Sequence, residues 1–381
     1  MNEHISLKEE EEKSVDSPGL SVLRVHLEAF RNYESEHVIL SEGFNIIAGK
    51  NAQGKTNFLE AIYLLSTTRL LRGQRDSEAI CQGHHRAIAA VELRGSETRL
   101  AMTLEAGTRK RASINGLNLP RAADLIGRLP CVCVSTLDMA IVRGEPSDRR
   151  LFLDLELSSL YPGYLRHLTH YKRALEQRNA LLRDSREWMQ PAAMFVPWEE
   201  QLATHGAALR IAREQFIERL SPFAFEAHGM IGGGESMSLR IESKDAAQEP
   251  ETILAALASS RQVDAARGGT SVGPHRDDLL IEVGGRDGRL FGSQGQQRTA
   301  VISVKLACLS VAREELGTPP LLLLDDILSD LDESRRALLV DVVLERAGQA
   351  VLTCTEASAA GERILDCAKV FHVNAGQVIE A

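Results

Sequence analysis

The sequence predicts an α/β fold that is interrupted by a mainly helical insertion. Apolar runs typical of strands alternate with helical patterns at both ends of the 381-residue chain. A glycine-rich loop around residue 50 joins a predicted strand to a predicted helix. Between the two ends, residues 151–219 are rich in Leu, Glu, Arg and Gln with few helix breakers, which favours two or three long helices.

The N-terminal elements follow the order strand, loop, helix. Val22–Glu28 and Phe44–Ala48 are predicted strands, because each is a mostly apolar run that ends near polar residues or glycine. A helix is predicted from Thr56, since the apolar residues after it fall on one helical face. Those residues are Phe58, Leu59, Ile62 and Leu65.

A second alternation of helices and strands occupies the C-terminal end. We expect a helix over about Gln297–Leu316, a strand at Leu321–Leu324, a helix from Glu333 and a strand at Ala350–Thr353. Pro130–Ser135 is a further predicted strand. The two ends of the chain therefore resemble parts of one α/β core.

The length of the chain exceeds that of a usual single core. We predict an acidic, solvated and disordered tail at residues 1–20, which carries four consecutive glutamates and no apolar segment of a secretory signal. Residues 21–150 and 261–381 are predicted to form the two parts of one α/β head domain. Residues 151–260 are predicted to form the inserted helical arm.

The composition is that of an ordinary globular protein, with 44% hydrophobic and 25% charged residues. No apolar run approaches the roughly 20 residues of a membrane-spanning helix. The six cysteines show no C-x-x-C pair and no ligand-like grouping with histidines, which fits a reducing compartment. We expect a soluble, cytoplasmic protein. Its net charge of -9 restricts any contact with DNA to local patches.

One motif predicts nucleotide binding. Eight consecutive residues match the P-loop pattern G-x-x-x-x-G-K-[ST], and they are Gly49, Lys50, Asn51, Ala52, Gln53, Gly54, Lys55 and Thr56. Between a strand and a helix, the backbone N–H groups of such a loop point at one place. Lys55 would neutralise the β and γ phosphates of ATP, and the Thr56 hydroxyl would coordinate Mg²⁺. A glycine turn with an exposed lysine is the less favoured alternative.

Two carboxylates end the apolar strand Leu321–Leu324, as the second metal-binding element of a P-loop ATPase requires. Asp325 would hold the magnesium through water. Asp326 is a candidate general base that orients the attacking water, and Asp332 lies one short turn further on as a third catalytic candidate. Helix capping is the alternative for Asp326 and Asp332. Because Asp326 is one methylene shorter than glutamate, we expect slow hydrolysis.

A polar segment opens the predicted C-terminal helix. Its candidate phosphate-binding residues are Ser293, Gly295 and Gln296, since the N-terminus of a helix offers N–H groups to an anion. A helix that is simply capped by its serine is the alternative.

These motifs, in this order, resemble those of an ABC-type ATPase, and within that class the chain resembles the RecF family of bacterial recombination mediators, which is related to SMC proteins. The resemblance runs from about Val22 to Val378. Its ordered motifs are FRNY (Phe30–Tyr33), NAQGKTN (Asn51–Asn57), G-x-P-x-x-RR-x-FLD (Gly144–Asp154), Y-x-x-AL-x-QRNxLL (Tyr171–Leu182) and T-x-x-GPHRDD (Thr270–Asp278). Where the family has S-P-E-D-L, this chain has S-T-L-D-M at Ser135–Met139, so no role is carried over to the middle carboxylate.

The resemblance implies an ABC-type P-loop head with an inserted, mainly helical domain. It implies an ATP-dependent homodimer, in which ATP lies between the P-loop of one copy and the Ser293 segment of another, with Arg31 and Asn32 near the nucleotide. A surface salt bridge is the alternative for Arg31. The implied partners are single-stranded, double-stranded and gapped junction DNA, with RecR and RecO. A weak, DNA-stimulated ATPase that serves a binding function is the expected activity.

One histidine and three arginine clusters each have two possible roles. His275 is a candidate catalytic residue or an equally plausible structural hydrogen-bonding residue. The clusters Arg109–Arg111, Arg69 with Arg72 and Arg75, and Arg149–Arg150 could contact DNA phosphates or form solvated faces.

Two other functions share some of these motifs. An ABC transporter ATPase has its signature much closer to its P-loop than Ser293 is to Thr56. A small-molecule kinase would leave the Ser293 segment without a use.

Overall fold

The computed structural model describes residues 21–73, 75–185 and 190–381. The predicted acidic tail lies outside these residues. Within the described ranges, no helix has both the length and the apolar character that crossing a bilayer requires.

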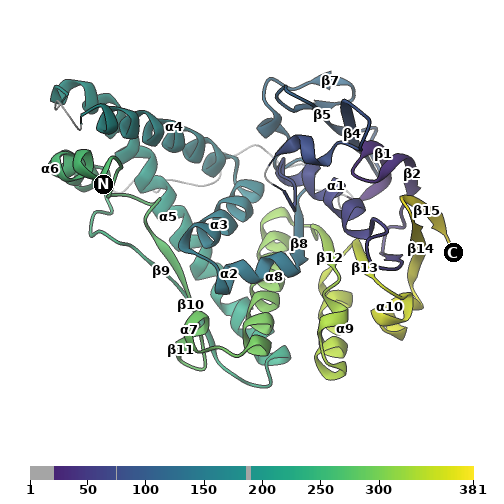
Figure 1. Cartoon of the computed structure of the whole chain (residues 1–381). Coiled ribbons are helices and arrows are strands. Elements are labelled where there is room, and N and C mark those ends of the chain that lie inside the picture. The colour runs from purple at the N-terminus through teal and green to yellow at the C-terminus, as the bar shows by residue number, and fades with distance from the viewer. Residues whose placement is uncertain (1–20, 74, 186–189) are drawn as a thin grey trace. The chain divides into compact units, whose positions relative to one another are not determined.

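The strands are β1 (Val22–Phe30), β2 (Tyr33–Ile39), β3 (Phe44–Ala48), β4 (Arg86–Leu93), β5 (Arg99–Glu105), β6 (Arg111–Ile114), β7 (Leu117–Asn118), β8 (Cys131–Ser135), β9 (Met237–Glu242), β10 (Asp278–Val283), β11 (Arg286–Asp287), β12 (Leu321–Asp325), β13 (Ala350–Cys354), β14 (Ala368–Asn374) and β15 (Gln377–Glu380). The helices are α1 (Lys55–Thr67), α2 (Ala140–Arg143), α3 (Pro146–Leu160), α4 (Pro162–Asp184), α5 (Ala192–Ile231), α6 (Pro250–Arg267), α7 (Gly288–Phe291), α8 (Gln294–Leu316), α9 (Glu333–Arg346) and α10 (Glu362–Leu365). Figure 1 labels most of them along the chain.

The chain divides into two compact units. The head unit comprises the described residues up to Met139 together with Glu226–Glu235 and Arg298–Ala381. The arm unit comprises Ala140–Phe225 and Ser236–Gln297. The head unit is thus built from segments that are far apart in the sequence.

A parallel sheet forms the centre of the head unit. Its strand order is β15-β14-β3-β13-β12-β8, and only β15 runs antiparallel to its neighbour. Every residue of β3, β12 and β13 is buried, as expected for a parallel sheet that is covered on both faces. The strands predicted at these positions are confirmed. Because the strands are parallel, β3 and β12 end at the same edge of the sheet.

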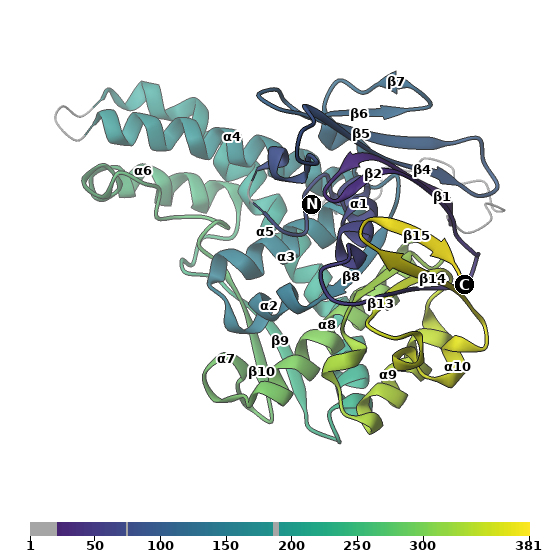
Figure 2. The same cartoon turned by 45° about the vertical axis from the view of Figure 1, so that its right-hand side comes forward.

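A second, antiparallel sheet has the order β2-β1-β4-β5-β6-β7. Figure 2 shows β4, β5 and β6 of this sheet side by side. Only β1 of this sheet was predicted from the sequence. The other strands are short or only partly apolar, so local pattern identifies them poorly.

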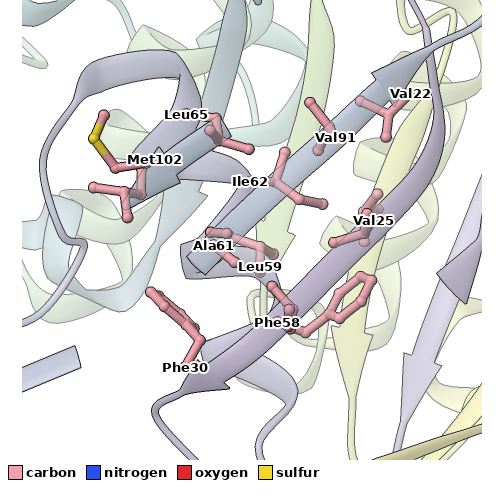
Figure 3. Close-up of a cluster of buried hydrophobic side chains, with 14 of the residues drawn as sticks. Val22, Val25, Phe30, Phe58, Leu59, Ala61, Ile62, Leu65, Val91 and Met102 are labelled. Atoms are coloured by element: carbon pink, nitrogen blue, oxygen red, sulfur yellow. The ribbon is translucent and has the colours of Figure 1, made fainter. Parts of the chain in front are cut away.

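Helix α1 packs against strands of both sheets. Its predicted apolar stripe is confirmed, and Figure 3 shows Phe58 and Ile62 among Val25, Val91 and other buried side chains of the antiparallel sheet. Burial extends beyond that stripe to most of the helix. The helix that follows the P-loop is therefore held in place by packing against both sheets.

The arm unit contains the long helices α3 and α4 and most of α5, which confirms the helices predicted between 151 and 219. It also contains an unpredicted small sheet of order β11-β10-β9. Buried ion pairs hold the helices together. Arg178 is fully buried and donates to Glu199 at 3.1 Å and to Asp264 at 2.8 Å.

Candidate nucleotide-binding site

Glycine is required at two positions of the P-loop between β3 and α1. Gly54 has φ 120°, and a Cβ there would lie 2.6 Å from the side chain of Asn32. A Cβ on Gly49 would lie 2.5 Å from the carbonyl oxygen of Val373 in β14. The loop is thus too close to its surroundings for any larger residue at these points.

Lys55, the first residue of α1, is buried and folds back over the loop. Its Nζ donates to the carbonyl oxygens of Gly49 at 2.7 Å and Lys50 at 3.1 Å. A lysine ammonium has three donors, so these two bonds leave capacity for an anion. The position fits a residue that neutralises phosphate.

Thr56 and Asp325 bring two oxygen ligands together at the edge of the sheet. The Thr56 hydroxyl donates to Oδ1 of Asp325 at 2.8 Å, and the hydroxyl of Thr353 in β13 donates to the same oxygen at 2.8 Å. Burial raises the pKa of Asp325, and the two hydroxyl hydrogen bonds oppose this change. A divalent cation would stabilise the charged carboxylate, so these oxygens fit a magnesium site.

Asp326 has a fixed orientation beside this pair. Its φ of 53° lies in the left-handed region, which aspartate tolerates better than most residues. Its N–H donates to the Thr353 hydroxyl at 2.9 Å, and its Oδ1 accepts from Ser329 at 2.7 Å. The carboxylate is half-buried and is not the N-cap of α9.

Asp332 is the N-cap of α9. Its Oδ1 accepts from the N–H of Arg335 at 3.0 Å, and its other oxygen lies 3.5 Å from Nε of the same arginine. The capping alternative therefore describes the geometry of Asp332.

The Phe30–Tyr33 motif braces the P-loop from the turn between β1 and β2. Asn32 donates to the carbonyl oxygen of Gln53 at 2.8 Å and accepts from Asn57 at 2.8 Å. The Tyr33 hydroxyl donates to the carbonyl oxygen of Gly54 at 2.9 Å. This bracing by Tyr33 was not predicted, because a side chain that bonds to backbone leaves no pattern in the sequence.

Arg31 forms an ion pair, but not one on an open surface. Its Nε donates to the fully buried Glu60 of α1 at 2.7 Å. Further bonds reach the carbonyl oxygens of Arg72 at 2.7 Å and Glu78 at 2.8 Å. Arg31 therefore joins α1 to the segment that follows it.

Ser293 and Gln296 form a capping box at the start of α8. Ser293 Oγ accepts from the N–H of Gln296 at 3.2 Å, and Gln296 Oε1 accepts from the N–H of Ser293 at 2.8 Å. Ser293 is exposed, and Gly295 and Gln296 are half-buried. Leu290 and Phe291 just before them are 70% and 66% exposed. The segment belongs to the arm unit, whereas the P-loop belongs to the head unit.

His275 is held as a structural residue of the arm unit. Its Nε2 lies 2.9 Å from the carbonyl oxygen of Thr270, and its Nδ1 lies 2.6 Å from the hydroxyl of Tyr171. Since the carbonyl can only accept, Nε2 carries the proton and Nδ1 accepts from Tyr171. Burial lowers the pKa of His275 to about 4. Both ring nitrogens are thus engaged in a neutral imidazole.

One suggested DNA contact is wrong. Arg149 is buried and forms a bidentate ion pair with Asp278, at 2.7 and 2.8 Å. This pair joins two of the family motifs inside the arm unit. Arg149 therefore has a structural role and does not face DNA phosphates.

Comparison with known proteins identifies the family. A family model described as the RecF/RecN/SMC N terminal domain matches residues 21–378. The DNA replication and repair protein RecF of Symbiobacterium thermophilum is 41% identical over 370 residues, which cover 93% of this chain and 97% of that protein. The chain belongs to the RecF family. RecF of Synechococcus sp. is 38% identical over 366 residues, covering 93% of this chain and 96% of the relative.

Solved structures agree with this assignment. A RecF–ATP structure of the RecFOR pathway has a TM-score of 0.86 at 30% identity, covering 95% of this chain and 98% of the other. An Smc head domain from Pyrococcus furiosus has a TM-score of 0.56 at 14% identity, covering 95% of this chain and 96% of that chain, which shows a shared fold. The predicted ABC-type ATPase head with an inserted helical domain is confirmed. As a RecF family member, the chain is a DNA replication and repair protein and not a transporter subunit.

Proposed function

We propose that this protein is an ATP-dependent DNA-binding switch of recombinational repair and replication-fork maintenance. The observation that carries the proposal is the hydrogen bond between Thr56 and Asp325, at the same sheet edge as the P-loop. Solved relatives are described as RecF bound to ATP in the RecFOR pathway. We infer the same nucleotide for this chain, held by residues 49–56.

Magnesium is the cation that this site fits. The Thr56 hydroxyl would bind it directly and Asp325 through water, since Mg²⁺ prefers oxygen ligands and keeps part of its hydration shell. When bound, the ion neutralises charge between the β and γ phosphates. Thr353 holds Asp325 in place from the intervening strand. Lys55 supplies the second positive charge.

Asp326 is the proposed residue that orients the attacking water. Its hydrogen bond with Ser329 and its fixed backbone hold the carboxylate beside Asp325. Its short side chain limits how closely it approaches a water on the γ-phosphate. Asp332 remains a further catalytic candidate, although its carboxylate is already engaged with Arg335. The result is a weak, DNA-stimulated ATPase.

A second copy of the chain would complete the site. Ser293 is exposed at the start of α8. Its hydroxyl and the N–H groups of the helix N-terminus could therefore bind the γ-phosphate of an ATP held by another subunit. Exposed Leu290 and Phe291 add apolar surface to the same segment. ATP would therefore act by closing a head-to-tail homodimer.

DNA is the proposed partner, in single-stranded, double-stranded and gapped junction forms, with RecR and RecO as protein partners in the cytoplasm. Local basic residues must supply the contacts. Lys110 and Arg111 are paired with Asp76 and Glu105, so much of their charge is already offset. Binding should depend more on closure of the dimer than on charge.

Fluorescence anisotropy tests the proposal by measuring DNA affinity. Gapped, duplex and single-stranded DNA are each titrated with ATP, with ADP and without nucleotide. We expect ATP to tighten binding by about tenfold or more on at least one DNA form, which equals about 1.4 kcal/mol. Equal affinity in all three nucleotide states on every DNA would contradict it.

A further inference from the structure

Glu34, Cys81 and His84 bring three different metal-ligating groups together in the head unit. One possible ligand atom from each lies within 4.8 Å of the others. Cys81 Sγ lies 3.6 Å from Glu34 Oε1, and His84 Nε2 lies 2.8 Å from Glu34 Oε2. The expectation that no cysteine groups with a histidine is therefore wrong for Cys81.

A tight turn sets the spacing of Cys81 and His84. The N–H of His84 donates to the carbonyl oxygen of Cys81 at 3.0 Å, and Gly83 between them has φ 90°, which glycine adopts without strain. This C-x-x-H turn places the thiol and the imidazole on the same side as Glu34, at the start of β2.

Backbone hydrogen bonds hold the turn against the end of β1. The N–H of Cys81 donates to the carbonyl oxygen of Ala29 at 2.8 Å, and the N–H of Arg31 donates to that of Ala79 at 2.7 Å. Phe30 and Ile80 form an antiparallel bridge between these bonds. The three side chains are thus attached to fixed backbone rather than to a free loop.

We propose that Glu34, Cys81 and His84 form a Zn²⁺ site. Zinc takes thiolate, imidazole and carboxylate ligands at about 2.0–2.3 Å, so tetrahedral ligand atoms lie roughly 3.4–3.6 Å apart. Cys81 Sγ already has this spacing from Oε1 of Glu34, whereas His84 Nε2 lies 2.8 Å from the other oxygen, Oε2. Rotation of the Glu34 and His84 side chains would bring one carboxylate oxygen to ligand spacing from both groups. Magnesium and calcium are poor candidates, because a thiolate and an imidazole replace the oxygens they prefer.

The site is open to solvent. Glu34 and His84 are exposed and Cys81 is half-buried, so a water or a partner's side chain would take the fourth position. The Cys81 S–H group donates a hydrogen bond to Oε1 of Glu34, so the thiol already points at the carboxylate. The bound ion would fasten the segment after α1 to the turn that carries Arg31 and Asn32.

Cobalt substitution of the full-length, reduced protein tests the site. Co²⁺ bound by Cys81 gives a thiolate-to-metal absorption band that Zn²⁺ abolishes by displacement, and metal analysis after gel filtration should give about one Zn²⁺ per chain. Cys81→Ser should remove the band. Glu34→Gln and His84→Gln should weaken Zn²⁺ binding by about tenfold or more in competition with a chelator.

Two matched controls separate this site from its surroundings. Cys367→Ser removes an exposed thiol outside the cluster, and His85→Gln removes the histidine next to His84. Both variants should bind Zn²⁺ like the original protein. Glu34 is exposed, so Glu34→Gln keeps the test valid even if Cys81→Ser fails to fold. Zn²⁺ binding that survives Cys81→Ser in full, for example at the His167–His205 pair of the arm, would overturn the proposal. So would a folded, reduced protein that shows no cobalt–thiolate band.

Discussion

Thr56 and Asp325 are 269 positions apart in the sequence, yet the hydroxyl of one donates to the carboxylate of the other at 2.8 Å. Parallel pairing of β3 and β12 with β13 between them produces this contact, because the carboxyl ends of all three strands meet at one edge. The site therefore depends on the strand order of the sheet as well as on the P-loop sequence.

Thr56→Val and Asp325→Asn should each weaken Mg²⁺-dependent ATP binding by about 10–100-fold. Valine has nearly the same shape as threonine but no hydroxyl, and asparagine removes the charge that balances the cation. Isothermal titration with ATP, with and without Mg²⁺, measures the effect. Thr169→Val in α4 is the control, since its hydroxyl only bonds to the helix backbone. Unchanged Mg²⁺ dependence in both site variants would show that these oxygens do not hold the ion.

Asp326→Asn should abolish most hydrolysis and preserve ATP binding. Asparagine tolerates the left-handed backbone at this position as aspartate does, so the change tests the carboxylate alone. We expect the original protein to turn over below about 1 s⁻¹ even with DNA bound, and the variant to be slower by about 10²-fold or more. Steady-state phosphate release measures both rates. A variant that hydrolyses ATP at the original rate would exclude Asp326 as the residue that orients water.

The central strands and the P-loop could be predicted because their signals are local. Leu321–Leu324 is a continuous apolar run, and the P-loop residues are consecutive. The support around them could not be predicted in the same way. Arg149 pairs with Asp278, and Tyr33 bonds to the backbone of Gly54, through contacts between distant parts of the chain.

The Glu34–Cys81–His84 cluster, which was not predicted, combines a local sequence signal with a contact between distant residues. The C-x-x-H spacing is visible in the sequence, but two ligands alone rarely define a metal site. Glu34 joins them only because the segment around Ile80 pairs with the end of β1. A third ligand from another strand has no local signal.

Acid should destabilise the arm unit through His275. Its pKa is lowered to about 4 in the folded protein, compared with the ordinary 6.5. The unfolded chain therefore binds a proton between these values while the folded chain does not, so stability is full above pH 6.5 and falls as the pH drops toward 4. The slope from this group is at most about 1.4 kcal/mol per pH unit.

Urea unfolding of the protein and of His275→Gln from pH 7.5 to 4.5 measures this effect. The variant should be less stable at pH 7.5, because it loses the bond to Tyr171, and its stability should fall less steeply with acid. His372→Gln, at an exposed position of β14, should keep the original slope. Equal slopes for the protein and His275→Gln would mean that His275 is not a source of acid sensitivity.

A shared active site predicts recovery of activity on mixing two inactive variants. Lys55→Ala disables the P-loop, and Ser293→Arg blocks the exposed start of α8. In a mixed dimer one site receives both defects and the other receives none. Random pairing makes about half of the dimers mixed, so hydrolysis should recover to roughly a quarter of the original rate. A flat baseline, with association confirmed by ultracentrifugation, would mean that each chain completes its own site.

If the P-loop controls DNA binding, the DNA affinity of Lys55→Ala should not respond to ATP. Lys55→Ala removes the ammonium group that donates to the carbonyl oxygens of Gly49 and Lys50. Lys55→Arg keeps the positive charge, but its planar guanidinium differs in shape from an ammonium. Both variants should bind DNA equally with ATP and with ADP, whereas the original protein binds more tightly with ATP. An alanine variant that keeps the full ATP dependence at unchanged affinity would show that the P-loop is not the switch.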